Sequence, residues 1–273
     1  MEPVARRVYR LVEPIHLVTY LAEEPTAALL ALGHRSYWDG YFAGRAAPLG
    51  RVPAAVVDAV FYNFAPGEVA RHVPRVWEVA SPEAALAARE QGAVAALRRI
   101  LGDLADSPGV ARAADLATVA AVSAPAHGRA LYAGLQALRV PDEPVARLWH
   151  AATLLREHRG DGHNAALLAA GVGGTEAHVL LALDLGMAPE KFGRVHHLPA
   201  AQLAAVVDGM RTRGLIDAAG GLSDTGRSTK DRIEALTDEL AAPAYDALRP
   251  GELDRLLGEL APIAAALEAT GSR

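Results

Sequence analysis

The chain has 273 residues, a net charge of −5 and no cysteine. Without cysteine there is no disulfide framework, no thiolate nucleophile and no cysteine-bound zinc, so a metal would need His, Asp or Glu ligands. The acidic balance argues against an obligate nucleic-acid binder, and no apolar run suits a signal peptide or a membrane span, which predicts a cytoplasmic protein without a membrane partner.

Most of the chain has a helical pattern. Alanine and leucine dominate, and apolar residues recur at three- and four-residue spacing, as in 83–101 and 144–158. This spacing predicts a nearly all-α fold. Proline is favoured in the first turn of a helix, so Pro82, Pro144 and Pro199 mark expected helix starts.

One segment has the pattern of a β-hairpin. In 214–223 two short apolar stretches flank Ala-Ala-Gly-Gly, directly after the helix expected over 199–214. Helix, turn, helix and hairpin is the order of elements in a winged helix. The sequence therefore predicts an all-α fold with a small β-wing.

The chain also contains an internal repeat. Residues 34–69 align with residues 158–192: each copy begins with His-Arg, reaches Asp-Gly within a few residues and passes through an apolar helix to Ala-Pro. Arg71 and Arg194 stand five residues past the two prolines, and Glu-Pro-Val-Ala-Arg occurs upstream of both copies. We interpret this pattern as an internal duplication of a helical unit.

The duplication predicts how the chain is organised. We expect three segments: an N-terminal winged-helix-like half over 1–101, a helical linker over 102–142, and a C-terminal winged-helix half with long final helices over 143–273. The polar segment "HRGDGH" at 158–163 is interpreted as a turn that starts a helix in the second copy.

Residues 210–248 resemble the closing part of MarR-type winged-helix proteins, with an arginine-flanked helix end, Gly-Leu-Ile, a short wing and Leu-Ser-Asp-Thr-Gly-Arg opening a long helix. With "EPIHLVTY", "YWDGYFAGRAAPLG", "FYNFAP", "LREHRGDGH" and "TDELAAP", the whole chain is similar to an actinobacterial family of tandem helix-turn-helix proteins. The resemblance implies the fold and suggests DNA binding, although a fold does not by itself establish a function.

The residues on the helix that would read DNA give little support to the prediction of DNA binding. The helix over 199–214 offers Gln202 and Asp208 in its middle and two arginines, Arg211 and Arg213, only at its end. The corresponding helix of the first half is mixed in sign, carrying Glu83, Arg89, Glu90, Arg98 and Arg99. A protein that contacts several phosphates concentrates positive charge better than this, so we interpret both helices as ordinary solvated faces.

Polar and aromatic residues gather near the start of each half and predict a small-molecule pocket. Glu13, His16 and Tyr20 are spaced to share one helix face. The residues expected to act as acids and bases are Glu13, His16, His158 and Asp161. Those expected to bind the ligand are Tyr20, His34, Arg35, Tyr37, Trp38, Asp39, Tyr62, Asn63, Arg71, Arg159 and His163.

No cofactor is predicted, because the sequence has no nucleophile elbow, phosphate loop or dinucleotide fingerprint. Glu13 and His16 could form half of a di-metal site, but no second such pair follows. His158, Asp161 and His163 could hold one metal, although histidine-rich turns are more often hydrogen-bonded structure. A metal on His, Asp or Glu therefore stays an alternative.

Together these patterns predict a small-molecule-binding protein on a tandem winged-helix scaffold. The first activity considered is cofactor-independent acid–base catalysis, as in a lyase, isomerase or hydrolase, on a small anionic or aromatic compound. The alternative is a ligand-responsive, DNA-binding transcriptional regulator, and a third reading is a helical interaction protein whose polar clusters only order the core. A homodimer is a separate expectation for the partners. The pocket interpretation requires one cavity surrounded by Glu13, His16, Arg35, Asp39, His158 and Asp161.

Overall fold

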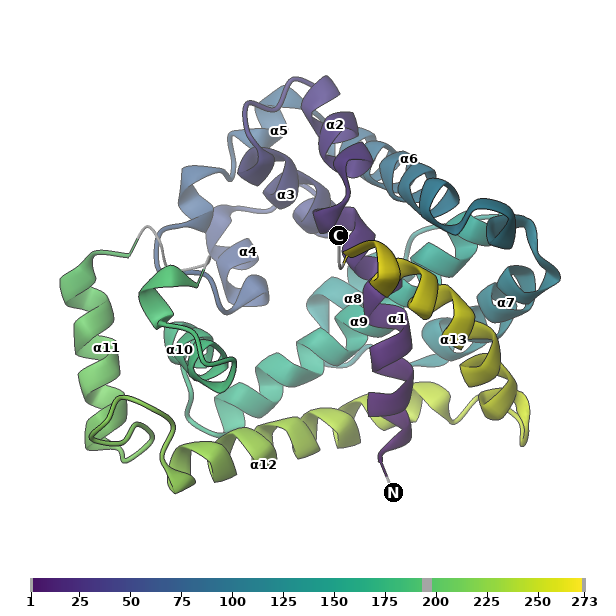
Figure 1. Ribbon diagram of the computed structural model, residues 1–273. Helices are drawn as coiled ribbons and strands as arrows, with labels where there is room; N and C mark the ends of the chain where they lie inside the picture. The colour runs from purple at the N-terminus through teal and green to yellow at the C-terminus, as the bar shows by residue number, and fades with distance from the viewer. Residues whose placement is uncertain (1, 193–197, 272–273) are drawn as a thin grey trace. The chain divides into compact units, whose positions relative to one another are not determined.

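The computed structural model describes residues 2–192 and 198–271, and the secondary structure of these residues is helical (Figure 1). Arg194 of the internal repeat lies outside the described residues. The all-α prediction is confirmed for the described residues, which contain no named β-strand. One isolated antiparallel bridge joins Ile216 and Leu222 inside the expected hairpin.

The contacts divide the chain into two compact units, which we call unit 1 (1–52, 72–161 and 238–273) and unit 2 (53–71 and 162–237). Unit 1 contains α1 (Val4–Leu21), α2 (Glu23–Ala31), α3 (Tyr37–Ala46), η1 (Ala47–Leu49), α5 (Val76–Val79), α6 (Pro82–Leu101), η3 (Gly102–Asp106), α7 (Pro108–Ser123), α8 (Ala130–Gln136), η6 (Ala242–Tyr245) and α13 (Glu252–Gly271). Unit 2 contains α4 (Ala54–Phe61), η2 (Val69–Arg71), α10 (Gly174–Asp184), η4 (Pro189–Lys191) and α11 (Ala200–Thr212). The helices α9 (Pro144–Ala169) and α12 (Asp224–Ala241) each carry residues of both units.

Three helix starts follow the proline signals. Ser81 caps α6, its side chain accepting a hydrogen bond from the Ala84 N–H at 3.2 Å, and Pro82 occupies the first turn. α9 begins at Pro144, and Pro199 is the N-cap of α11. The three predicted helix starts are confirmed. Proline suits such positions because its ring fixes φ near the helical value and its missing N–H would have no partner inside the helix.

Small residues let the helices of unit 1 approach closely. α6 packs against α1, α2 and α3, and α13 packs against α1 and α7. The buried face of α7 is mainly alanine, and α6 carries Gly92 where it meets α2. A Cβ at Gly92 would stand 2.4 Å from the Cα of Pro25, so the two backbones are nearly in contact and only glycine fits there.

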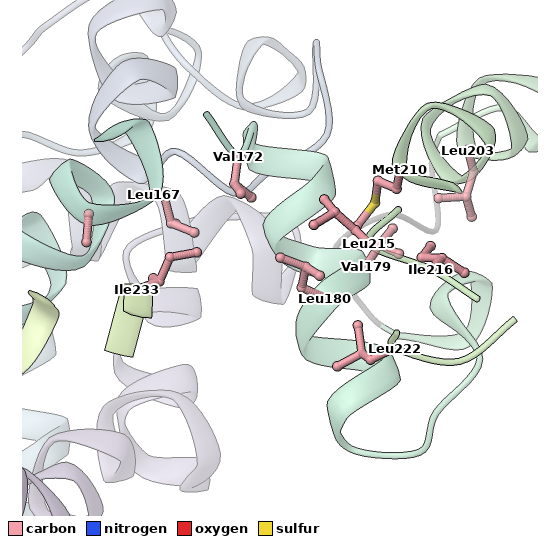
Figure 2. Packing of buried hydrophobic residues seen from close by; sticks show 11 residues of the cluster. Leu167, Val172, Val179, Leu180, Leu203, Met210, Leu215, Ile216, Leu222 and Ile233 are labelled. Carbon is pink, nitrogen blue, oxygen red and sulfur yellow. The ribbon is translucent and has the colours of Figure 1, made fainter. Parts of the chain in front are cut away.

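Unit 2 has a core of its own between α10, α11 and the bridged turn that follows (Figure 2). Val179 and Leu180 of α10 pack with Met210 of α11 and with Leu215 and Ile216 beyond it. The two helices thus bury one side each against a shared apolar core, which is the packing expected of a helix-turn-helix.

The segment "HRGDGH" is not a turn. It lies in the middle of α9, which runs without interruption from Pro144 to Ala169. Gly160 and Gly162 each disfavour a helix by about 1 kcal/mol relative to alanine. Tertiary contacts override this preference, because His158 and Asp161 are buried. The first copy of the repeat behaves differently, since its Tyr37 begins α3.

The close contact at Gly92 gives a test of the fold. We expect Gly92→Ala to lower the free energy of unfolding by about 1–3 kcal/mol, because the added methyl group would overlap the α2 backbone. Gly258→Ala in α13 is the matched control: a Cβ there meets nothing within 4 Å. This control should raise stability by about 0.5–1 kcal/mol through helix propensity. Urea unfolding measures both, and a similar change in the two variants would contradict the close contact.

Candidate functional site

Polar side chains of α1 and α9 meet in the interior of unit 1. His16 is fully buried, and its Nδ1 lies 3.1 Å from the Thr153 Oγ1 on α9. Its Nε2 lies 3.8 Å from the Glu157 Oε1, one turn further along α9. The ring of Tyr20 packs edge-on against His16, with the ring centres 5.2 Å apart. The expected common face of Glu13, His16 and Tyr20 therefore points at α9.

Guanidinium groups surround the Glu157 carboxylate. Arg156 donates to the Glu157 Oε2 at 3.0 Å, and Arg45 of α3 donates to the same oxygen at 3.4 Å. Arg45 also donates to the Tyr41 hydroxyl at 2.9 Å, and Arg156 lies 3.9 Å from the Glu13 Oε2. We call the set the polar cluster: Glu13, His16, Tyr20, Arg45, Arg89, Arg156 and Glu157.

The charges in the polar cluster fix the protonation states of His16 and Glu157. Burial alone would raise the pKa of Glu157, but the positive charges of Arg156 and Arg45 outweigh it and hold that pKa far below its usual range. Burial, aided by the charge of Arg156, lowers the pKa of His16 well below its usual value. At neutral pH the cluster thus pairs a neutral imidazole with an ionised carboxylate.

Several buried atoms of the polar cluster have no hydrogen-bond partner among the residues that the structure describes. They are the Glu13 Oε2, His16 Nε2, Tyr20 hydroxyl, Arg89 Nε and Nη2, and Glu157 Oε1, with the neighbouring His150 Nε2. In folded proteins about nine buried polar groups in ten are hydrogen-bonded to protein or to ordered water, so such a concentration calls for partners beyond the described side chains. A small cavity of about 10 Å³, roughly the room of one water molecule, adjoins the cluster between α1, α2 and α3.

The aromatic and charged residues after α2 form separate contacts. The Asp39 Oδ1 accepts hydrogen bonds from His72 and Arg75, both at 2.7 Å. Burial would raise the pKa of Asp39, but hydrogen bonding to His72 and the charge of Arg75 lower it overall. Tyr37 and Trp38 pack against Tyr41, and the Tyr37 hydroxyl donates to the Tyr20 carbonyl oxygen at 3.3 Å.

The remaining candidates before α9 differ in exposure. His34 is buried, and burial lowers its pKa. Arg35 and Arg71 are exposed at the surface, and Arg71 lies 3.8 Å from the Glu68 Oε2. In unit 2 Tyr62 has a positive φ of 54°, and its hydroxyl donates to the Val172 carbonyl oxygen at 2.6 Å.

Tyr62 and Asn63 form a strained turn that fits the start of α10. The Asn63 N–H donates to the Phe61 carbonyl oxygen at 2.6 Å, which closes a γ-turn centred on Tyr62. A Cβ at Gly174 would stand 1.9 Å from the Tyr62 carbonyl oxygen, so the turn and the helix start are in backbone contact. This contact explains the unusual φ of Tyr62 and indicates a structural role for the turn.

His158 and Asp161 form a second group within unit 1. The ring of His158 packs edge-on against Tyr132, with the centres 4.9 Å apart, and the Asp161 Oδ2 accepts from the Tyr132 backbone N–H at 3.0 Å. Burial, helped by the charge of Arg129, lowers the pKa of His158 to about 4, and burial raises the pKa of Asp161 to about 6.

Arg159 and His163 are engaged in other contacts. Arg159 donates to the Asp238 Oδ1 at 2.6 Å and lies over the Tyr9 ring at 4.6 Å. In unit 2 the His163 Nδ1 lies 3.0 Å from the Thr237 Oγ1. Arg159 is therefore held in an ion pair.

The structure does not gather in one group the six residues that were expected around one cavity, Glu13, His16, Arg35, Asp39, His158 and Asp161. Of these six, Glu13 and His16 belong to the polar cluster, and the other four lie outside it, at the places described above.

Sequence reasoning missed Glu157 and misjudged Arg89. Trp149, Thr153 and Glu157 follow one another at four-residue spacing inside the helix expected over 144–158, and this stripe is the signal that could have found Glu157. Arg89 was expected on a solvated face, yet it is 1% exposed. The signal that could have found it is its place in the apolar stripe of α6, between Ala85 and Ala93.

The profile of the helix-turn-helix family matches residues 5–272, nearly the whole chain. The chain belongs to this helix-turn-helix family. No curated protein and no solved structure gives a significant match. Among the described residues of this helix-turn-helix protein, no group of three His, Asp or Glu side chains is arranged to ligate a metal. In the same residues no single helix has the length and apolarity to cross a membrane, although α9 and α10 as one bent pair meet both criteria.

The second helix of the pair in unit 2, α11, exposes a nearly uncharged surface. Its exposed residues are Ala200, Ala201, Gln202, Ala204, Ala205, Asp208, Gly209, Arg211 and Thr212. Four cations of this helix-turn-helix unit are paired with carboxylates: Arg211 with Asp208, Arg213 with Glu176, Arg227 with Asp224 and Lys230 with Asp184, at 2.7–3.0 Å. Phosphate groups would therefore have to compete with these carboxylates.

Buried histidines predict that the helix-turn-helix protein loses stability in acid. Burial lowers the pKa of His150 and of His158 to about 4, from 6.5 in the unfolded chain. As pH falls from 6.5 to 4 the unfolded state takes up protons that the folded state does not, so stability is lost in this window. Asp161 opposes this loss, since its raised pKa makes the folded state gain a proton below about pH 6.

We expect His158→Met to reduce the loss of stability between pH 7 and pH 4.5 by about 2 kcal/mol. His127→Asn, at an exposed position of the same unit, is the matched control and should keep the full loss. Urea unfolding at the two pH values provides the measurement. An unchanged loss in the His158 variant would show that this side chain does not stay neutral in the folded state.

Proposed function

We propose that the protein is a ligand-responsive, DNA-binding helix-turn-helix protein, in which unit 2 contacts DNA and the polar cluster of unit 1 holds a small molecule. Family membership favours this reading over the enzymatic one. The observation that carries it is the packing of α10 and α11 around one core while α11 keeps a long exposed face. Such a face is what the second helix of a helix-turn-helix presents to the major groove.

The finer features of this proposal rest on the resemblance of the sequence to MarR-type winged-helix proteins and to actinobacterial tandem helix-turn-helix proteins. We propose that the turn closed by the bridge between Ile216 and Leu222 acts as a reduced wing of MarR type. We also propose that the chain arose by internal duplication, which is supported by the two Glu-Pro-Val-Ala-Arg copies, since both stand at helix starts, those of α1 and α9. An actinobacterial origin, a cytoplasmic location and a homodimer belong to the same proposal.

The proposal predicts how DNA binding responds to two residues of α11. Gln202 is the exposed side chain that can bond an adenine edge, so Gln202→Ala should reduce discrimination between specific and scrambled DNA about 5- to 100-fold. Asp208→Asn removes the carboxylate that holds Arg211 and should tighten binding to both DNAs. The measurement is fluorescence anisotropy on the DNA upstream of the protein's own gene, titrated from low to physiological salt.

Gln91→Ala, at an exposed position of α6 in unit 1, is the matched control and should bind as the unchanged protein does. Failure of the unchanged protein to bind the specific DNA more tightly than the scrambled DNA would rule out sequence-specific recognition. Loss of binding in the Asp208 variant would show that this carboxylate assists the contact.

A second candidate function is acid–base catalysis in the polar cluster. It is favoured by one observation: neutral His16 presents an Nε2 without a hydrogen-bond partner 3.8 Å from the ionised Glu157. A neutral imidazole so placed could take a proton from a bound molecule, and Glu157 would stabilise the imidazolium that forms. This role requires the tautomer in which the Nδ1 carries the proton and donates to the Thr153 Oγ1, which leaves the lone pair on the Nε2.

This candidate predicts proton exchange at carbon. Incubation with pyruvate in D₂O should replace the methyl protons faster than in buffer alone, followed by loss of the methyl signal in proton NMR. His16→Asn should reduce the rate at least 10²-fold, the usual contribution of a general base, while His127→Asn should leave it unchanged. A rate no faster than that of buffer would remove proton transfer from such 2-oxo acids as the function.

A further inference from the structure

Leu21, the last residue of α1, is a large apolar side chain that unit 1 leaves in solvent. Its exposed fraction is 78%, the highest among the exposed large apolar side chains that the structure describes, and the next is that of Leu168 on α9, at 66%. A single exposed leucine on a protein surface needs no explanation. Leu21 is not isolated, because Pro14 and Leu17 precede it at spacings of three and four residues and so lie on the same face of α1.

This face of α1 forms one wall of an apolar groove in unit 1. α13 ends beside the end of α1 (Figure 1), and the end of α6 forms the third wall. Ile100 of α6 and Leu267 of α13 line the groove, so apolar side chains from three helices surround an open space of about 320 Å³. The cavity beside the polar cluster measures only about 10 Å³. The groove, unlike that cavity, has room for side chains of a second molecule.

Charged side chains of both signs line the groove. Arg99 stands on the α6 wall and Glu268 on the α13 wall. Arg99 donates to the Glu24 carboxylate through its Nε and Nη2, yet its side chain is still 56% exposed, and Glu268 is exposed as well. These charges give the groove no excess of positive charge, so an anionic lipid surface is a poor match for it.

A groove with these features fits a second copy of the same surface. In a two-fold dimer the same patch of each chain faces the other, so the patch has to be complementary to itself. This patch supplies both halves of each contact: a projecting leucine with a groove to receive it, and an arginine and a glutamate on different walls. A groove that receives an unrelated helix needs only the receiving half. With a two-fold axis through the groove, Leu21 of each copy enters the groove of the other, and Arg99 of each copy faces Glu268 of the other.

We propose that the groove between the ends of α1, α6 and α13, together with Leu21, Arg99 and Glu268, is the interface of a two-fold homodimer. This inference rests on the homodimer that belongs to the proposed function, and it supplies the interface. Burial of Leu21 in the groove of the other copy removes apolar surface from water, which drives association. The two pairs of Arg99 and Glu268 fix the register of the two chains.

The oligomeric state of the full chain tests the proposal. Sedimentation velocity over a dilution series should show a dimer in reversible exchange with the monomer. Leu21→Gln should raise the dissociation constant of the dimer about tenfold or more, because it places an amide in an apolar contact. Leu168→Gln, at the other strongly exposed leucine, is the matched control and should dimerise as the unchanged protein does. Both leucines are mostly exposed in the single chain, so neither change should lower the melting temperature of the monomer.

Charge reversal tests the two-fold arrangement itself. Arg99→Glu places like charges at both charged contacts of the dimer, and so does Glu268→Arg, so each variant alone should dimerise about tenfold more weakly. A mixture of these two variants should form a heterodimer, because opposite charges then face each other at both contacts, and native mass spectrometry distinguishes it by mass. Arg98→Glu, at the neighbouring arginine that also pairs with carboxylates, is the matched control and should dimerise as the unchanged protein does.

Three results would overturn this interface. A chain that stays monomeric up to about 100 µM would do so, because specific interfaces of standard size have dissociation constants in the micromolar range or below. A dimer that neither Leu21→Gln nor charge reversal weakens would use another face of the chain. A monomer that binds vesicles of uncharged phosphatidylcholine, and loses this binding in Leu21→Gln, would assign the groove to a lipid surface instead.

The DNA-binding measurement separates this inference from the proposed function. Sequence-specific DNA binding by a monomer overturns the dimer interface and leaves the DNA-binding part standing. Dimerisation through Leu21 without specific DNA binding has the opposite meaning.

Discussion

The carboxylate of Glu157 is the interaction on which the interior of unit 1 depends. It is buried on α9, and it draws Arg156 of its own helix and Arg45 of α3 toward the imidazole of His16 on α1. Two helices near the start of the chain, α1 and α3, therefore meet the distant α9 at one charged group. Because removing one partner of a buried ion pair leaves the other uncompensated, these side chains are constrained together rather than one by one.

The polar cluster and the helix-turn-helix pair use different kinds of surface. In unit 1 polar atoms are buried and several lack partners, which is a costly arrangement unless another molecule binds there. In unit 2 the apolar residues are buried, and four cations, Arg211, Arg213, Arg227 and Lys230, are already paired with carboxylates. The division of labour that we propose follows from this contrast. Of the four places where the chain passes from one unit to the other, two lie inside continuous helices, α9 and α12.

Local rules were enough to predict much of the helical fold. Pro82 and Pro144 start helices where a fixed φ is useful, and Glu13, His16 and Tyr20 share a face because their spacing matches one helical period. The failures arose where tertiary contacts override local preference. Two glycines and several charges made 158–163 look like a turn, but burial of His158 and Asp161 keeps it helical. Arg89 looked solvated because it was judged by its charge rather than by its place in the apolar stripe of α6.

The contact between Gly92 and Pro25 has a consequence for how this protein can change during evolution. Where side chains separate two helices, a larger residue on one can be balanced by a smaller residue on the other. Here the backbone of α2 itself lies against the α6 glycine, so no exchange of side chains can compensate for a larger residue at Gly92. In diverging copies of this sequence, position 92 should stay glycine even while the alanines around it drift.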